Sequence, residues 1–276
     1  MNPLITANQL EEIINSGEDV LICDCRFDLA KPEAGKAAYL ENHIPGAIYV
    51  DLDHDLSGQK SGKNGRHPLP LPEDWAKTKT RLGMDNNTLV VAYDNQGSIF
   101  ASRLWWMLKA TGHANVRVLD GGLDAWSGPI GKTPRQPIAC SRLLDPMPYV
   151  GLVLLEEVLE NLQTHQNKIV DARANDRFHG ENETLDPIGG HIPGALNHCY
   201  KENLSGKLFK TREQLYQEFV NLLGTTKTAE VIHQCGSGVT ACHNLLAMEV
   251  AGLKGARLYA GSWSEWCADP SRPVER

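Results

Sequence analysis

The 276-residue sequence lacks several features that would place it in other protein classes. Its N-terminus, from Met1 to Thr6, has no basic segment and no long apolar run, so we expect neither a signal peptide nor a membrane span. The formal net charge is −7, and no cluster of basic residues suggests a nucleic-acid partner. We therefore expect a protein that binds neither membranes nor nucleic acids.

The seven cysteines lack the spacing of a disulfide framework or of a zinc site. Cys23 and Cys25 are too close for an ordinary disulfide, and no paired Cys-x-x-Cys motif occurs. We therefore expect no metal, no cofactor, free thiols and a cytoplasmic, reducing location. With 41% hydrophobic residues, the chain is long enough for one or two domains with substantial cores.

Three short motifs occur twice and in the same order, which indicates two homologous domains. The pairs are Asp24-x-Arg26 with Asp171-x-Arg173, His43-Ile-Pro-Gly-Ala47 with His191-Ile-Pro-Gly-Ala195, and Leu119 to Trp126 with Tyr259 to Trp266. We predict domains over residues 1–127 and 149–276, joined by a proline-rich linker over 128–148.

Each half alternates short apolar runs with helical patterns, which predicts an α/β fold. We expect a mostly parallel sheet flanked by helices in each domain. In the first half, the patterns predict strands at Leu89–Tyr93 and Val116–Leu119 and a helix at Ile99–Ala110. In the second half they predict helices at 152–162, Arg212–Leu223 and 239–251, and strands at 169–170, 230–233 and Arg257–Tyr259.

The segment from Val231 to Ala241 carries the most informative chemistry. An apolar run ends at Cys235, a glycine-containing loop follows, and a helical pattern begins, so the thiol should lie near a helix N-terminus. The free N–H groups and the helix dipole there favour an anion, and hence the thiolate that acts as a nucleophile. Gly236 and Gly238 allow the backbone to curl around the sulfur. We interpret this segment as a loop that holds a catalytic cysteine.

Three other interpretations of this loop compete. Gly236-x-Gly238-x-x-Ala241 also fits a dinucleotide-binding fingerprint, although the next strand, Arg257–Tyr259, lacks the acidic residue that this site uses. A cysteine-dependent phosphatase would need an arginine at position 241, which is alanine. A buried structural cysteine is the third alternative, and it leaves the two glycines unexplained.

Aligning the two halves places Asp94 opposite Cys235 and Gly97 opposite Gly238. Only the second half therefore has the thiol. Because aspartate commonly caps a helix N-terminus, we expect Asp94 to be structural and the first domain to be catalytically inactive.

The paired His-Ile-Pro-Gly-Ala motifs and the segment Cys235-Gly-Ser-Gly-Val-Thr-Ala241 resemble the tandem-domain rhodanese-type sulfurtransferases. The resemblance covers essentially the whole chain and implies two rhodanese-like α/β domains. It implies that Cys235 takes sulfane sulfur from a small donor as a persulfide and passes it to a thiol or cyanide acceptor, with a thioredoxin-like protein as one candidate. We expect Gly236, Gly238, Val239 and Thr240 to bind the substrate through the ring of N–H groups around the sulfur.

Two features implied by the resemblance disagree about the donor. Gly236 and Ser237 follow the cysteine as they do in mercaptopyruvate sulfurtransferases, whereas thiosulfate sulfurtransferases have two basic residues there. Arg177, just before an aromatic residue, is the arginine expected to bind the donor carboxylate bidentately. A second substrate arginine nine residues later is replaced by Asp186, which resembles the thiosulfate enzymes more. We expect 3-mercaptopyruvate as the donor, with thiosulfate as the alternative.

Ser237 adds a hydroxyl that can hydrogen-bond the donor or pass a proton, and His43 is a candidate for a proton relay with it. The alternative for His43 and His191 is a structural role in the repeated turn, which we favour for His191. The polar loop over 57–72 has the length of many functional loops, but its residues suggest no definite role. A persulfide carrier or redox sensor without turnover is a further hypothesis.

Overall fold

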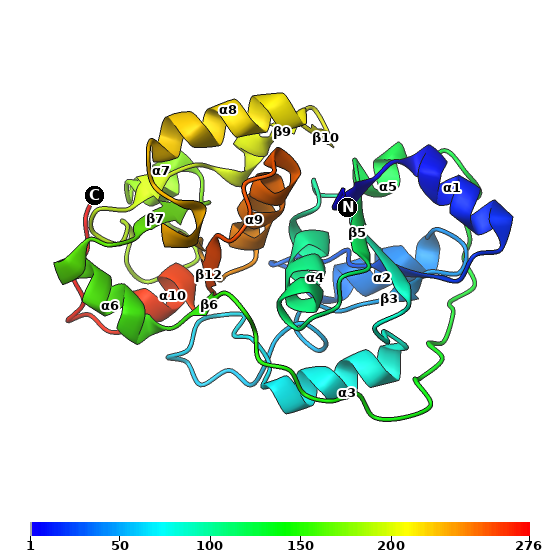
Figure 1. Cartoon of the computed structure of the whole chain (residues 1–276). Coiled ribbons are helices and arrows are strands. Elements are labelled where there is room, and N and C mark those ends of the chain that lie inside the picture. Colours follow the sequence, from blue (N-terminus) through cyan, green and yellow to red (C-terminus); the bar gives the residue numbers. More distant parts are fainter. Residues whose placement is uncertain (1) are drawn as a thin grey trace. The chain divides into compact units, whose positions relative to one another are not determined.

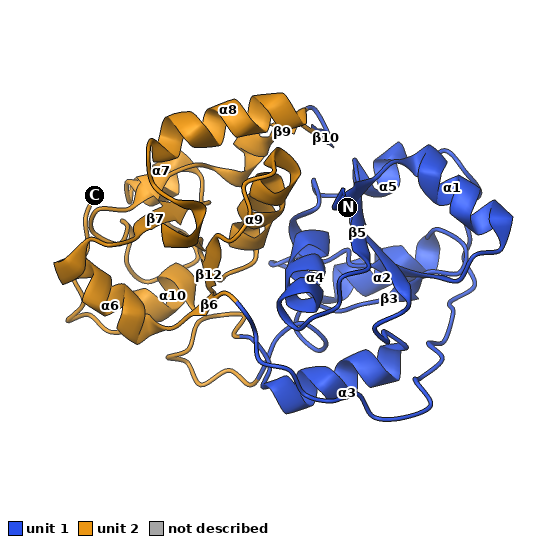
Figure 2. Cartoon of the chain, in the orientation of Figure 1, with its two compact units in different colours: residues 1–58, 69–150, 206–208 blue, residues 59–68, 151–205, 209–276 orange. Residues whose placement is uncertain are grey.

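The computed structural model describes residues 2–276, and the chain divides into two compact units (Figures 1 and 2). Unit 1 contains Met1–Gly58, Leu69–Val150 and Gly206–Leu208, and unit 2 contains Gln59–Pro68, Gly151–Ser205 and Phe209–Arg276. The segment Gln59–Pro68 therefore belongs to unit 2, although it interrupts the first half of the sequence. Among the described residues, no helix is both long and apolar enough to cross a membrane.

Unit 1 is built on a five-stranded sheet whose neighbouring strands are parallel, in the order β1-β5-β4-β2-β3. The strands are β1 (Leu4–Ile5), β2 (Val20–Asp24), β3 (Ile48–Tyr49), β4 (Leu89–Tyr93) and β5 (Val116–Leu119). The helices are α1 (Ala7–Ser16), α2 (Glu33–Glu41), α3 (Pro72–Leu82), α4 (Ile99–Ala110) and α5 (Gly122–Ala125).

Unit 2 repeats this topology in the order β6-β12-β11-β7-β8, again with parallel neighbours. The strands are β6 (Leu152–Val153), β7 (Lys168–Asp171), β8 (Leu196–Asn197), β11 (Val231–Gln234) and β12 (Arg257–Tyr259). The helices are α6 (Leu155–Thr164), α7 (Asn175–Phe178), α8 (Arg212–Leu223), α9 (Thr240–Ala251) and α10 (Ser262–Trp266), with short 3₁₀ turns η1 (Tyr200–Asn203) and η2 (Thr228–Glu230). A separate pair of short strands joins β9 (Leu204–Ser205) to β10 (Leu208–Phe209).

The central strands are buried because both faces of each sheet are covered. In β4 the side chains from Val90 to Tyr93 are buried without exception, and in β11 every residue is buried. Continuous burial of this kind is typical of parallel strands that lie between layers of helices. Helix α4 contacts β4 and β5, and helix α9 contacts β11 and β12. The predicted α/β fold with two homologous parallel-sheet units is confirmed.

One predicted element is wrong at its start. The sequence pattern predicted a helix over 152–162, but Leu152 and Val153 form strand β6, which pairs with β12, and the helix begins at Leu155. A run of four apolar residues is compatible with either structure, and here the open edge of β12 supplies strand hydrogen bonds. The other predicted helices and strands occur within one residue of their expected ends.

The proline-rich segment over 128–148 contains neither helix nor longer strand, and it lies in unit 1. Gly131 exchanges two backbone hydrogen bonds with His43, and the N–H of Cys140 donates to the carbonyl of Thr80. Its role as a linker between the domains at the predicted boundaries stays a prediction.

Candidate functional site

The loop from Cys235 to Val239 joins the end of β11 to the start of α9. The N–H of Cys235 donates to Ser262 Oγ at 3.1 Å, and its carbonyl accepts from the N–H of Trp263 at 2.9 Å. The carbonyl of Gly236 accepts from the N–H of Ser264, also at 2.9 Å. The loop is therefore held from one side by the first residues of α10, and the Cys235 side chain is only 2% exposed.

Gly238 explains why the loop needs glycine. Its φ is +77°, a conformation that side chains with a Cβ rarely adopt. A Cβ built there would lie 2.3 Å from the carbonyl oxygen of Ala260, which is far inside van der Waals contact. The loop can approach the chain before α10 this closely only because position 238 has no side chain.

The corresponding loop in unit 1 surrounds the carboxylate of Asp94. The Asp94 carboxylate, which is fully buried, accepts four backbone N–H bonds at 2.8–3.0 Å, from Gln96, Ser98, Phe100 and Ala101. Burial raises the pKa of Asp94, and the four N–H groups act in the opposite direction. Asp94 is not the N-cap residue of α4, which is Ser98, but its carboxylate caps two N–H groups of the first turn.

The repeat extends this observation to unit 2. Asp94 aligns with Cys235, and its carbonyl accepts from the N–H of Leu123 as the carbonyl of Cys235 accepts from that of Trp263. Both loops thus rest on the following short helix in the same way. A backbone that surrounds a carboxylate with N–H groups in one unit is suited to a thiolate or persulfide anion in the other.

Ser237 contacts a histidine that the sequence did not single out. Ser237 is 5% exposed, and its Oγ lies 2.8 Å from Nδ1 of His67, which is 6% exposed. The segment that carries His67 lies against the start of α10, because the N–H of Arg66 donates to Ser264 Oγ at 3.0 Å. Gly65 has φ +86°, and a Cβ there would lie 2.8 Å from the carbonyl oxygen of Gly261. The position of Gly65 within a polar, glycine-rich loop was the feature of the sequence that could have predicted a functional turn next to His67.

His43 and His191 occupy equivalent, buried positions in the two units. The ring nitrogens of His43 face the carbonyl oxygens of Tyr39 at 2.6 Å and Thr133 at 3.1 Å, and its ring stacks on Tyr39. Nδ1 of His191 faces the carbonyl of Phe178 at 2.9 Å, and its ring stacks on Phe178. These contacts support a structural role for both. The relay proposed for His43 stays a prediction, while the hydrogen bond to Ser237 that it required is made by His67.

Arg177 belongs to a cluster of charged side chains beside the cysteine loop. We define the arginine–acid cluster as Arg66, Arg177, Glu183 and Asp186. Arg177 donates to both oxygens of Glu183, at 2.8 and 2.9 Å, and to Asp186 at 3.4 Å. Arg66 pairs with the other oxygen of Asp186. Both carboxylate side chains are 3% exposed, against 21% for Arg177 and 30% for Arg66.

The two arginines of this cluster lie next to Gly236. A Cβ on Gly236 would be 2.9 Å from one Arg66 nitrogen and 3.5 Å from the nearest Arg177 nitrogen. Guanidinium groups from outside the loop therefore lie beside the residue that follows Cys235. Sequence reasoning missed Arg66, which comes from the segment Gln59–Pro68 and pairs with Asp186, the residue that replaces the second substrate arginine implied by the resemblance.

The acids of the cluster have different electrostatic surroundings. Burial raises the pKa of Asp186, against the lowering effect of Arg66 and Arg177. The pKa of Glu183 is lowered: burial opposes ionisation, but hydrogen bonds from the N–H groups of Leu185 and Asp186 and the pair with Arg177 outweigh it. Arg173 lies behind the cluster in a buried pair with Asp171 at 2.7 Å, as Arg26 pairs with Asp24 in unit 1.

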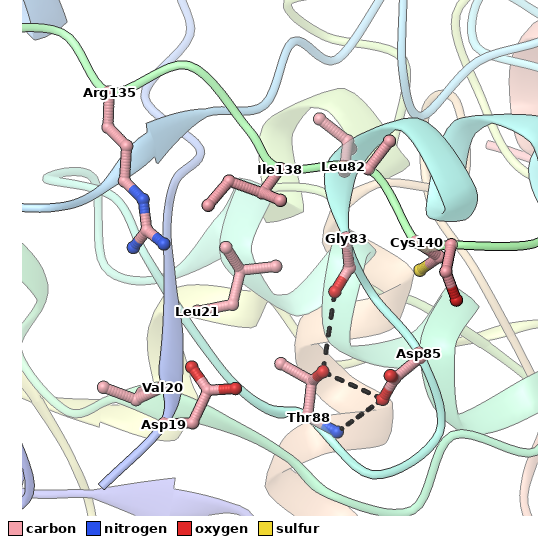
Figure 3. A pocket seen from close by; sticks show the side chains of 12 residues that line it. Asp19, Val20, Leu21, Leu82, Gly83, Asp85, Thr88, Arg135, Ile138 and Cys140 are labelled. Carbon is pink, nitrogen blue, oxygen red and sulfur yellow. Dashed lines mark hydrogen bonds between the residues drawn. The ribbon is translucent and has the colours of Figure 1, made fainter. Parts of the chain in front are cut away.

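A cavity of about 300 Å³ lies elsewhere, in unit 1 (Figure 3). Asp19, Asp85, Arg135 and Cys140 line it, together with apolar side chains that include Leu21 and Ile138. None of the predicted site residues is among its lining residues. Within residues 2–276, no group of three or more histidine, cysteine or acidic side chains is arranged to hold a metal ion.

Comparisons with known proteins agree with the repeat. A family model described as a rhodanese-like domain matches residues 6–129 and again residues 154–269. The chain is 44% identical over 276 residues to a protein of Pseudomonas aeruginosa named as a probable 3-mercaptopyruvate sulfurtransferase, covering 98% of this chain and 97% of that protein. It is 30% identical over 282 residues to the thiosulfate sulfurtransferase of Bos taurus, covering 95% of this chain and 91% of that protein. Among solved structures, 3-mercaptopyruvate sulfurtransferase from Leishmania major superposes with a TM-score of 0.82 at 29% identity, covering 93% of this chain and 72% of that one.

Proposed function

The chain belongs to the rhodanese-like domain family, and we propose that it is a sulfurtransferase that uses 3-mercaptopyruvate as donor. The sulfur atom of the donor moves to Cys235, where it becomes the outer, sulfane sulfur of a persulfide, and from there it passes to a thiol or to cyanide. The family assignment agrees with the resemblance that the sequence motifs predicted.

The observation that carries this proposal is the loop shared by the two units. In unit 1 its backbone N–H groups surround the Asp94 carboxylate, and in unit 2 the aligned residue is the Cys235 thiol. Backbone N–H groups fixed in this way stabilise negative charge without reorganising during the reaction. The loop can therefore stabilise both the attacking thiolate and the persulfide anion that follows. We expect Gly236, Gly238, Val239 and Thr240 to contribute to this site.

The chemistry needs one proton at the departing carbon. The Cys235 thiolate attacks the donor sulfur, the new S–S bond forms, and the donor C–S bond breaks with its electron pair going to carbon as the enolate of pyruvate. Protonation of that carbon gives pyruvate, while the donor's thiol proton stays on, or dissociates from, the outer sulfur of the persulfide. The Ser237 hydroxyl, hydrogen-bonded to His67, is the group that can deliver the proton and be recharged. An acceptor nucleophile then takes the outer sulfur and regenerates the thiolate.

The donor carboxylate fits the guanidinium groups beside Gly236. The sequence predicted that Arg177 binds this carboxylate. Arg66 supplies a second guanidinium group beside Gly236. A carboxylate that is separated from the reacting sulfur, as in 3-mercaptopyruvate, can reach these groups while the sulfur meets Cys235. Thiosulfate is the second candidate donor, since guanidinium N–H groups beside Gly236 can also donate to its anionic oxygens.

We infer that only unit 2 catalyses sulfur transfer, with residues 149–276 as the catalytic domain and 1–127 as the inactive one. The support is the buried Asp94 carboxylate, which fills the position of the thiol in unit 1. All seven cysteines are free, which supports the expected cytoplasmic, reducing location. A thioredoxin-like dithiol is a suitable acceptor because its second thiol can release the sulfur.

Steady-state turnover tests the function. Wild type should use 3-mercaptopyruvate with a higher kcat/KM than thiosulfate, with cyanide as the acceptor. Cys235→Ser should lower turnover of both donors by a factor on the order of 10³ or more, because a hydroxyl does not replace the thiolate. Mass spectrometry of wild type after donor addition should find one extra sulfur atom on the peptide that contains Cys235.

The alternatives give different results. A persulfide carrier or redox sensor would form the same persulfide but show no turnover with cyanide or small thiols. Turnover retained in Cys235→Ser would place the chemistry on another cysteine and would contradict the assignment of Cys235 as the nucleophile. A higher kcat/KM for thiosulfate would replace the donor and leave the persulfide mechanism intact.

A further inference from the structure

The arginine–acid cluster contains as many buried acids as arginines. Glu183 accepts from Arg177 on both of its oxygens, and Asp186 lies between Arg66 and Arg177, one carboxylate oxygen facing each. Two positive and two negative side chains give a formal charge of zero. The neighbouring pair of Arg173 with Asp171 cancels in the same way.

The zero net charge of the cluster matters because its two arginines lie beside Gly236, where we expect the donor to bind. Their nitrogens approach Gly236, whereas the carboxylates are 3% exposed and lie behind them. A bound donor therefore meets two guanidinium groups whose charge is already neutralised, and Nε and Nη2 of Arg177 already donate to Glu183. Such a site keeps its directional contacts for a carboxylate but offers little net attraction to a second negative charge.

We propose that Asp186, supported by Glu183, sets the charge selectivity of the donor site, so that a singly charged donor is preferred over a doubly charged one. The inference rests on the proposed function, and it identifies Asp186 as a specificity-determining residue. The resemblance related an acid at position 186 to the thiosulfate enzymes, whereas the geometry here relates it to neutralisation of the two arginines beside Gly236.

The charge argument makes a directional prediction. Replacing Asp186 by asparagine retains the size of the side chain and one oxygen acceptor, but it raises the charge of the cluster by one. Coulomb energy scales with the product of the charges, so a dianion gains about twice as much as a monoanion from this change. The binding ratio of dianion to monoanion should therefore rise about tenfold, which is a difference that a free energy of about 1.4 kcal/mol produces.

Binding is measured on the full chain with Cys235→Ser, which removes the nucleophile and keeps the site. Tryptophan fluorescence or calorimetry gives the Kd of thiosulfate, a dianion, and of pyruvate, a monoanionic carboxylate. The ratio is compared between this variant and the same variant with Asp186→Asn. Asp186→Glu, which keeps the charge, should restore the original ratio, and Glu183→Gln should shift it in the same direction as Asp186→Asn.

Glu181→Gln is the matched control, because it removes the same charge from an exposed side chain on the same segment. It should leave the ratio within about twofold, as expected for a solvent-screened charge. An unchanged or reduced ratio in both Asp186→Asn and Glu183→Gln, with native circular dichroism, would overturn the proposal. This binding readout does not depend on turnover, so a failure of the proposed function is seen separately, in the steady-state assay of wild type.

The pH dependence gives an independent check. Burial raises the pKa of Asp186, and the charged groups that face it are Arg66, Arg177, Arg173 and Glu183. Protonation of Asp186 should act like Asp186→Asn, so the ratio should rise as the pH falls toward the pKa of this carboxyl. In the Asp186→Asn background this rise should be lost; a rise of equal size there would assign the effect to another group.

Discussion

Replacing Gly238 by alanine tests the geometry of the loop that holds Cys235. The residue has φ +77°, and a left-handed conformation costs a residue with a Cβ about 1–2 kcal/mol. The new Cβ would also lie 2.3 Å from the oxygen and 3.0 Å from the carbonyl carbon of Ala260. These are backbone atoms, so relief requires the loop and the start of α10 to separate, at a further cost of about 1–3 kcal/mol.

Gly194→Ala is the matched control within unit 2. Its φ is +76°, and nothing lies within 4 Å of the position of its Cβ. This variant should lose only the conformational part, about 1–2 kcal/mol of unfolding free energy. The difference between the two variants therefore isolates the overlap with Ala260.

Urea unfolding followed by tryptophan fluorescence gives both stabilities, and steady-state turnover gives the functional effect. Gly238→Ala should be at least about 1 kcal/mol less stable than Gly194→Ala. Its kcat/KM should fall about 100-fold, because displacement of the loop by about 1 Å misplaces the nucleophile. Equal stabilities, or full activity in Gly238→Ala, would refute the claim that contact with the chain before α10 shapes the loop.

Two further predictions concern Arg177 and His233. Arg177→Ala should lower kcat/KM for 3-mercaptopyruvate at least about tenfold, and Arg177→Lys should recover only part, because lysine keeps the charge and loses the fork; unchanged turnover would contradict the carboxylate assignment. Burial lowers the pKa of His233 from 6.5 to about 3. Below pH 6.5 the unfolded state therefore binds a proton that the folded state does not, and the free energy of unfolding decreases as the pH is lowered. Between pH 7 and pH 5 this group should lower the free energy of unfolding by about 2 kcal/mol. In urea titrations His233→Gln should abolish this loss, whereas the control His179→Gln, at an exposed residue, should leave it in place.

Much of the fold could be predicted because buried parallel strands are continuous apolar runs. Leu89–Tyr93 was predicted with its observed ends because it is a continuous apolar run, covered on both faces from Val90 onward. Val116–Leu119 was also predicted with its observed ends, although Arg117 interrupts its apolar run. The same reasoning was less successful at Leu152 and Val153, where the apolar run continues into the helix that follows. Only the free edge of β12 decides that these two residues form a strand.

The local sequence also predicted the position of Cys235 between β11 and α9, because a strand, a glycine-containing loop and a helix are successive parts of one segment. The repeat added the pairing of this cysteine with Asp94, and the structure then showed four N–H groups around that carboxylate. The groups around the donor could not be found in this way. His67 and Ser237 are 170 positions apart, and Arg66 and Asp186 are 120 positions apart. No periodic pattern connects such distant residues, so only the packing of the segment Gln59–Pro68 within unit 2 brings Arg66 and His67 to the loop.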